Sequence, residues 1–301
     1  MRKILKWLGI ILGSLIGLVL ILAAVLITIG TSQLNKTYDI EPETIAIPTD
    51  SDTIARGQYI YSTTCASCHG DNLAGTSFFD DPALGNIPAP NLTAGNGGIG
   101  NTYTDADYVR AIRHGVRPDG TPLMIMPSNA FYYFSDEDLG AIIAYIKNAT
   151  PQNQPWPAKR LSPMGRILLA AGAFGDVLHA ETIDHTGPRP TAPAQGVTAV
   201  YGEYLVNTGD CRNCHGPDLT GQQPGEPGAP FAPNLTSSGH LADWSAEDFI
   251  AAMRTGQTPD GHEIDGDFMP WEHIGRMTDD DLTAMFLYLQ SLPTTTTEST
   301  K

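Results

Sequence analysis

The chain has 301 residues and a formal net charge of −16, since 33 Asp and Glu outnumber 17 Lys and Arg. Such an acidic chain is not expected to bind nucleic acid, because it would repel the phosphate backbone. Its surface would either steer encounter with a basic protein partner or simply keep a secreted protein solvated. Beyond an apolar N-terminal stretch, the chain is long enough for two domains of ordinary size.

Residues 1–30 are predicted to form a transmembrane anchor. Their basic residues come first and are followed by an uncharged apolar run, 7–29, which exceeds the roughly 20 residues needed to cross a bilayer. A cleavable signal peptide is the alternative, but its apolar region is shorter, about 7–15 residues. The positive-inside rule places the basic end in the cytoplasm. We therefore expect a single-pass protein of the cytoplasmic membrane, with a linker over 31–51 and the rest facing the periplasm or the cell exterior.

All four cysteines lie in two copies of the pattern Cys-x-x-Cys-His. Two thiols three residues apart can add to the two vinyl groups of a haem, and the next residue then offers an imidazole to the iron. The alternatives for each pair are a thioredoxin-like redox site, half of a zinc site or a disulfide, but a histidine at the same place in both copies favours haem attachment. The pattern predicts two covalently bound haem c groups, whose attachment and proximal-ligand residues are Cys65, Cys68, His69, Cys211, Cys214 and His215.

The two motifs lie inside a longer internal repeat. Both copies continue, in the same order, with Pro-Asn-Leu-Thr, an arginine, Pro-Asp-Gly, Met-Pro and Asp-Leu. The interval from the asparagine of Pro-Asn-Leu to the methionine of Met-Pro is 35 residues in both copies, whereas the first copy has three extra residues between His69 and Pro90. Insertions that spare the motif positions are what a shared fold allows. The repeat predicts one domain over 52–150 and a second over 197–293.

Each copy is predicted to contain three helices and little sheet, because Gly, Pro, Asn and Asp dominate the segments between them. The first helix leads into the cysteine motif, and the third begins where acidic residues crowd its first turn, as the helix dipole favours. The expected positions are from about Ala55 and Val200 for the first helix, 105–113 and 246–254 for the second, and after Ser135 and Thr278 for the third.

Residues 151–196 are predicted to be a proline-rich connector. Within it, 167–178 is apolar but too short to cross a bilayer. We expect a short helix there, packed against or between the two domains. The threonine-rich tail, 294–301, is expected to be disordered.

With these motifs, the chain resembles a tandem pair of class I cytochrome c domains, so the expected fold is all-α: two small, haem-wrapping helical domains with long loops after one transmembrane helix. In that family a glycine and an aromatic residue on the first helix meet an aromatic residue on the last. Gly57, Tyr61 and Tyr145 match these positions in the first copy. In the second copy Val206 replaces the first-helix aromatic, which predicts looser helix packing there.

The resemblance also implies the remaining haem contacts. The carbonyls of Pro90 and Pro233 would accept a hydrogen bond from the proximal histidines, which orients the ring and leaves Nε2 for iron. Met126 and Met269 match the distal methionine ligand, and a thioether raises the haem potential. The alternative ligands that the sequence leaves open are Met124 in the first copy and His262, His273 and Met277 in the second.

A haem with both axial positions filled suits electron transfer, since no open iron is left for a substrate. The chain is therefore predicted to be an electron carrier rather than an enzyme. It is similar to cytochrome subunits of membrane-bound alcohol, aldehyde and sugar dehydrogenases, although those commonly carry three haem domains. The expected partners are the membrane, through the N-terminal helix, and redox proteins such as a dehydrogenase, an oxidase or a soluble cytochrome, with a basic docking face.

Two other functions remain as alternatives. A dihaem enzyme of the peroxidase or thiosulfate-oxidising type would need an open distal site or a further cysteine ligand, and the chain has no fifth cysteine. The second domain could instead be a docking module, although its motifs are as complete as those of the first. Arg113 and Arg254 recur at the same place in the two copies and could neutralise a haem propionate or solvate a helix end.

Overall fold

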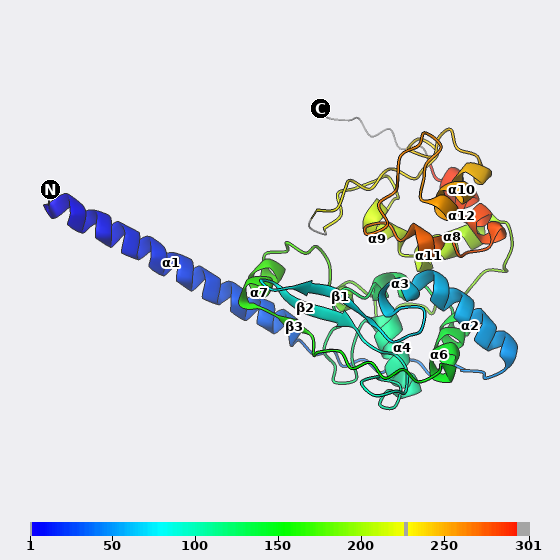
Figure 1. Ribbon diagram of the computed structural model, residues 1–301, viewed down its shortest axis with the longest axis horizontal. Helices are drawn as coiled ribbons and strands as arrows, with labels where there is room; N and C mark the ends of the chain where they lie inside the picture. Colours follow the sequence, from blue (N-terminus) through cyan, green and yellow to red (C-terminus); the bar gives the residue numbers. More distant parts are fainter. Residues whose placement is uncertain (1, 226–227, 294–301) are drawn as a thin grey trace.

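The computed structural model describes residues 2–225 and 228–293, which form one long N-terminal helix and a body of two helical units (Figure 1). Helix α1 (Arg2–Leu34) projects away from the body, and most of its side chains are exposed. Among the described residues it is the one helix that is long and apolar enough to cross a membrane. The predicted disordered tail, 294–301, lies outside the described residues.

Both repeats fold as predicted, with three main helices each. A one-turn helix carries the cysteine motif, and another follows the Met-Pro pair. The first helix of the first repeat begins before the expected Ala55, because Asp50 caps it by accepting a hydrogen bond from the Thr53 amide. The helices of the first repeat are α2 (Ser51–Thr64), α3 (Ala66–His69), α4 (Asp105–His114), α5 (Ser128–Phe131) and α6 (Asp136–Asn148), and those of the second are α8 (Ala199–Thr208), α9 (Cys211–His215), α10 (Ala246–Thr255), α11 (Trp271–Ile274) and α12 (Asp279–Ser291).

Matching side-chain caps determine where the later helices of each repeat begin. Thr104 and Ser245 each form a capping box with the aspartate three residues on, at the starts of α4 and α10. Ser135 and Thr278 each accept a hydrogen bond from a backbone amide in the first turn of α6 and α12. Because the caps occur at equivalent positions, the two repeats keep the same framework around their methionine segments.

A glycine on the first helix of each repeat allows close contact with the last helix. A Cβ atom at Gly57 would lie 1.9 Å from the carbonyl oxygen of Ala141, and one at Gly202 would lie 1.9 Å from that of Ala284. Helices can approach this closely only where no side chain intervenes. The crossings of α2 with α6 and of α8 with α12 therefore depend on these two glycines.

The aromatic contact expected in the first repeat is present, with the rings of Tyr61 and Tyr145 centred 5.4 Å apart. In the second repeat, Val206 is fully buried in the shared core. The smaller side chain is thus accommodated without leaving the helix face exposed.

A small antiparallel sheet, which the sequence did not predict, occupies the longer segment of the first repeat between His69 and Pro90. Strands β1 (Thr76–Asp81) and β2 (Gly85–Ala89) form a hairpin, and β3 (Arg160–Leu161) adds to it from the connector, in the order β1-β2-β3. The connector is thereby held against the first repeat.

The helix of the connector begins earlier than predicted and packs against the first repeat, which is one of the two expected placements. Helix α7 (Pro163–Ala170) is capped by Ser162, and Gly172 with a φ of +73° follows its end, so the helix does not extend over 167–178. It packs against the end of α1, where the Arg166 guanidinium donates to the Thr31 hydroxyl at 3.1 Å, rather than between the two repeats (Figure 1). The body and α1 are thus joined by side-chain contacts as well as by the chain.

The N-terminal linker runs along the first repeat rather than hanging free. The Tyr38 amide donates to the Gly120 carbonyl at 2.9 Å, and the Arg110 Nε donates to the Ile40 carbonyl at 3.2 Å. Lys36 forms an exposed ion pair with Glu181 in the short 3₁₀ helix η1 (His179–Glu181) at 2.7 Å. Linker and connector therefore both lie on the first repeat.

Candidate functional site

The two cysteine motifs occupy equivalent positions at the ends of the first helices. Helix α2 ends at Thr64 with Cys65 as its C-cap, and α3 then carries Cys68 and His69 within one turn. Helix α9 carries the second motif in the same way. No disulfide joins any two of the four cysteines, all of which lie among the described residues. Each motif thus presents two thiols and an imidazole on one helical turn, which is the arrangement that covalent haem attachment requires.

The environment of the thiols does not suit the alternative uses of a Cys-x-x-Cys pair. Burial raises the pKa of the Cys65 thiol to about 12 and that of Cys211 to about 12. A thioredoxin-like pair needs the opposite, a lowered pKa that yields a thiolate at neutral pH. Within 2–225 and 228–293, no three His, Cys, Asp or Glu side chains are gathered as a metal site would require, so the two pairs do not share one zinc ion.

The proximal histidines are oriented in the same way in both repeats. His69 Nδ1 lies 3.0 Å from the Pro90 carbonyl oxygen, and His215 Nδ1 lies 2.9 Å from that of Pro233. Because a carbonyl oxygen only accepts, Nδ1 carries the proton and the lone pair is on Nε2. Burial lowers the pKa of both imidazoles, which favours the neutral form that binds iron.

Backbone hydrogen bonds hold the proline segments beside the histidines. The Leu92 amide donates to the Leu73 carbonyl at 2.9 Å, and the Leu235 amide donates to the Leu219 carbonyl at 2.8 Å. Leu73 and Leu219 both have the left-handed φ that non-glycine residues rarely adopt, +60° and +59°. The same unusual conformation occurs at the same place twice, which is typical of a backbone held for a ligand.

The two candidate methionines of the first repeat lie in different apolar clusters. Met124 is buried with Leu178 and other connector residues, whereas Met126 packs, partly buried, against the core that the helices share. Ile125 between them has a left-handed φ of +76°, and its amide donates to the Val177 carbonyl at 2.8 Å. Of the two sulfurs, that of Met126 is the one placed beside the helical core of the repeat.

In the second repeat Met269 also packs, partly buried, against the shared core. The alternative ligands are used differently: Met277 is buried in the core, and its carbonyl accepts from Arg254 at 2.7 Å. His262 is exposed, and His273 approaches the Ser62 carbonyl of the first repeat. The donor set of each repeat, two thiols, an imidazole and a thioether, fits a covalently attached haem with two axial ligands.

The recurring arginines form hydrogen bonds and ion pairs at the start of the last helix of their repeats. Arg113 is fully buried, donates to the Phe134 carbonyl at 2.8 Å and pairs with Asp136 at 2.9 Å. Arg254 repeats this pattern, with bonds to the carbonyl before the helix cap and to Asp279, at 2.7 Å each. Of the two roles left open by the sequence, the structure shows the helix-end role in both repeats.

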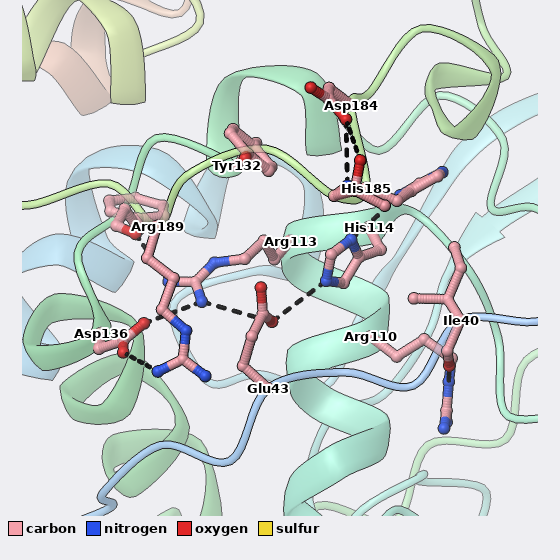
Figure 2. Close-up of polar contacts among 12 residues, drawn as sticks. Ile40, Glu43, Arg110, Arg113, His114, Tyr132, Asp136, Asp184, His185 and Arg189 are labelled. Carbon is pink, nitrogen blue, oxygen red and sulfur yellow. Dashed lines mark hydrogen bonds and ion pairs between the residues drawn. The ribbon is translucent and has the colours of Figure 1, made fainter.

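Sequence reasoning did not find a polar cluster around Arg113 in the first repeat. Figure 2 shows Glu43 of the linker between Arg113 and His114, with His114 in turn facing His185 of the connector. The His114 Nε2 to Glu43 Oε2 distance is 3.2 Å, and the Nδ1 atoms of the two histidines lie 3.0 Å apart. These contacts join segments about 70 residues apart and fasten linker and connector to α4.

Acid is expected to lower the stability of the first repeat through His179, which lies on η1 next to the segment that contains Met126. Its side chain is buried with no hydrogen-bond partner at Nδ1, and burial lowers its pKa. As the pH falls, the unfolded state therefore binds a proton at this histidine before the folded state does. The free energy of unfolding keeps its full value above a pH of about 6.5 and decreases below it, by at most about 1.4 kcal/mol per pH unit. Calorimetric unfolding at neutral and mildly acidic pH measures this loss, and His179→Gln should reduce it. An equal loss in that variant would contradict the assignment.

Comparison with known proteins agrees with the geometry of the two sites. The cytochrome c family model matches twice, over 54–150 and 199–293. The chain belongs to the cytochrome c family. Membership implies covalently bound haem c, as the two cytochrome c motifs predicted.

Several curated proteins resemble both cytochrome c domains at once. The fructose dehydrogenase cytochrome subunit of Gluconobacter japonicus is 30% identical over 298 residues, covering 90% of this chain and 58% of its own. The cytochrome c subunit of a quinone-type alcohol dehydrogenase from Gluconacetobacter polyoxogenes is 29% identical over 283 residues, 81% of this chain and 57% of its own. The cytochrome c subunit of gluconate 2-dehydrogenase from Pantoea cypripedii is 30% identical over 274 residues, which cover 79% of this chain and 59% of its own. The chain thus spans less than two thirds of the length of each.

Proposed function

We propose that this protein is a membrane-tethered dihaem cytochrome c that relays single electrons between protein partners, with one haem c in each repeat. Haem c, when bound, supplies a one-electron couple at its iron. The chain contributes attachment, orientation and ligation. The residues assigned to these roles are Cys65, Cys68, His69, Pro90 and Met126 in the first repeat and Cys211, Cys214, His215, Pro233 and Met269 in the second.

One observation carries this proposal: the same site is built twice. In each repeat a proline carbonyl orients the proximal imidazole, at 3.0 and 2.9 Å, and a methionine packs partly buried against the helical core. A histidine and a methionine together fill both axial positions, and the thioether raises the potential. Both repeats are therefore equipped for electron transfer, which argues against a second repeat that only docks.

The long apolar helix α1 supports the same function. Helix α1 is apolar enough to span a bilayer, and its basic residues lie at the N-terminal end. By the positive-inside rule the haem domains would face the periplasm or the cell exterior. Anchored there, the protein would exchange electrons along the membrane surface.

The names of the relatives suggest the partner. Each is the cytochrome subunit of a dehydrogenase, so we propose a dehydrogenase as the electron donor of this chain and an oxidase or soluble cytochrome as its acceptor. A net charge of −16 suits a basic docking face on such a partner. The alternative of a peroxidase or thiosulfate-oxidising enzyme is not favoured, because the relatives are cytochrome subunits and each repeat has a methionine placed by its core.

An optical redox titration of the haem-loaded full chain in detergent tests the function, together with pyridine-haemochrome counting. We expect two haems per chain, each with the weak red absorption band of a ferric haem bound by methionine sulfur, and each reduced at positive potential. A high-spin haem without that band, whose spectrum shifts on adding peroxide or thiosulfate, would show a catalytic site instead.

A further inference from the structure

The two repeats share a face, at which the second repeat lies against α2 and α6 of the first (Figure 1). On one side of this face, Tyr59 from α2 crosses to the second repeat. Its hydroxyl donates to Asp281 in the first turn of α12 and accepts from the Thr278 amide at 3.0 Å. Tyr59 therefore supplies both a donor and an acceptor to the capped start of a helix in the other repeat.

The reverse contact is made by the equivalent tyrosine of the second repeat. Tyr204 from α8 donates to Asp138 in the first turn of α6 at 2.7 Å and accepts from the Ser135 amide at 3.3 Å. Tyr59 and Tyr204 both stand two residues after the helix-crossing glycine of their repeat, and both aspartates precede the leucine of the Asp-Leu pair. The two repeats thus exchange the same contact around an approximate two-fold axis.

The Tyr204 contact is shielded from water and reinforced by charge, whereas the Tyr59 contact is partly exposed. Tyr204, Asp138 and Ser135 are buried, and Arg56 forms a two-pronged pair with the Asp138 carboxylate, at 2.9 Å for each nitrogen. Arg56 also reaches the hydroxyl of Tyr201, on the second repeat, at 3.4 Å. Burial is the main reason why the pKa of Tyr59 and of Tyr204 lies well above its ordinary value, so both hydroxyls keep the proton that they donate.

The shared face also brings each cysteine motif against the methionine side of the other repeat. Asn213, between the two cysteines of the second motif, forms hydrogen bonds of 2.6 and 3.1 Å with Asn129, three residues after Met126. On the opposite side, Arg276 pairs with Asp71, two residues after His69. The relative placement of the two haem-attachment segments is therefore set at this face.

We propose that Tyr59 and Tyr204 are positioning residues that form a reciprocal clasp, holding the two haem domains in one fixed relative orientation. This inference rests on the proposed function as a dihaem electron relay. A fixed pair of haem sites makes the separation of the two redox centres constant. Each hydroxyl acts on the other domain through the start of its last helix rather than by touching a haem.

The double variant Y59F/Y204F tests the clasp in the haem-loaded full chain. It removes two hydroxyls and leaves the aromatic packing, and circular dichroism in the Soret region reports the mutual orientation of two haems through the splitting of their signal. We expect the split signal to fall by at least about half in the double variant, with haem content and the methionine band unchanged. Exchange of the Ser135 and Thr278 amides with deuterium should be roughly five- to tenfold faster, since each loses one hydrogen bond.

Tyr133→Phe is the matched control, because Tyr133 is exposed and lies in the same domain as Tyr59. It should leave both measurements as in the unmodified protein. A split signal that is unchanged in Y59F/Y204F, or that is missing from the unmodified protein, would overturn the clasp while leaving a two-haem, methionine-ligated relay intact. A haem count other than two per chain, or a missing methionine band in the unmodified protein, would instead contradict the proposed function.

Discussion

Replacing Cys65 and Cys68 together by alanine is expected to halve the haem content of the purified protein, from two haems per chain to one. In the proposed function the two thiols of the first motif would be the attachment points of the first repeat, and the second repeat has its own pair. Pyridine-haemochrome counting against protein concentration measures the change. The remaining haem should keep its methionine band, because its ligands lie in the other domain.

The matched control is the same double substitution in the second motif, Cys211→Ala with Cys214→Ala. It should also leave one haem, and the two variants together should retain the full set of spectral features of the unmodified protein. Loss of both haems in either variant would show that the domains cannot acquire haem independently. Retention of both would show that attachment does not depend on these cysteines.

Met126→Leu is expected to lower the potential of one haem by on the order of 0.1–0.2 V, within the roughly 0.8 V range over which axial ligands tune haem. The substitution keeps an apolar side chain of similar volume and removes only the sulfur, which stabilises ferrous iron. A redox titration should show one unchanged and one lowered wave. About half of the red charge-transfer absorption should disappear with the lowered wave.

Met124→Leu is the control for this variant, since the same change is made two residues away in the other apolar cluster. Its potentials should not move, and a Met to Leu exchange of similar volume should cost less than about 1.5 kcal/mol of stability. If Met124→Leu lowered a potential and Met126→Leu did not, the ligand assignment in the first repeat would be reversed.

The polar cluster of Figure 2 adds to the first repeat contacts with Glu43 of the linker and His185 of the connector. The second repeat has Thr255 where the first has His114, and a threonine lacks the two ring nitrogens that contact Glu43 and His185. In the first repeat the linker and the connector join the body to α1. The first domain is therefore the part of the body that is fastened to α1.

The sequence alone determined the features that depend on local chemistry. Two thiols and an imidazole within five residues predict haem attachment at the motifs that begin with Cys65 and Cys211, without reference to the rest of the chain. The helix caps at Ser135 and Thr278 are likewise local, because each cap is satisfied within three residues. The repeat then extended these local features to two domains of one family, as the family match shows.

Only the tertiary structure decided the features that depend on contacts between distant segments. Met124 and Met126 are nearly equivalent in the sequence, and they differ because the connector near Leu178 packs on one of them. The exchange of Tyr59 and Tyr204 joins residues separated by 222 and 66 positions, respectively, from their aspartate partners. Such pairs leave no periodicity or spacing in the sequence, because the energy that selects them arises only when both domains are folded and the polar groups between them are removed from water.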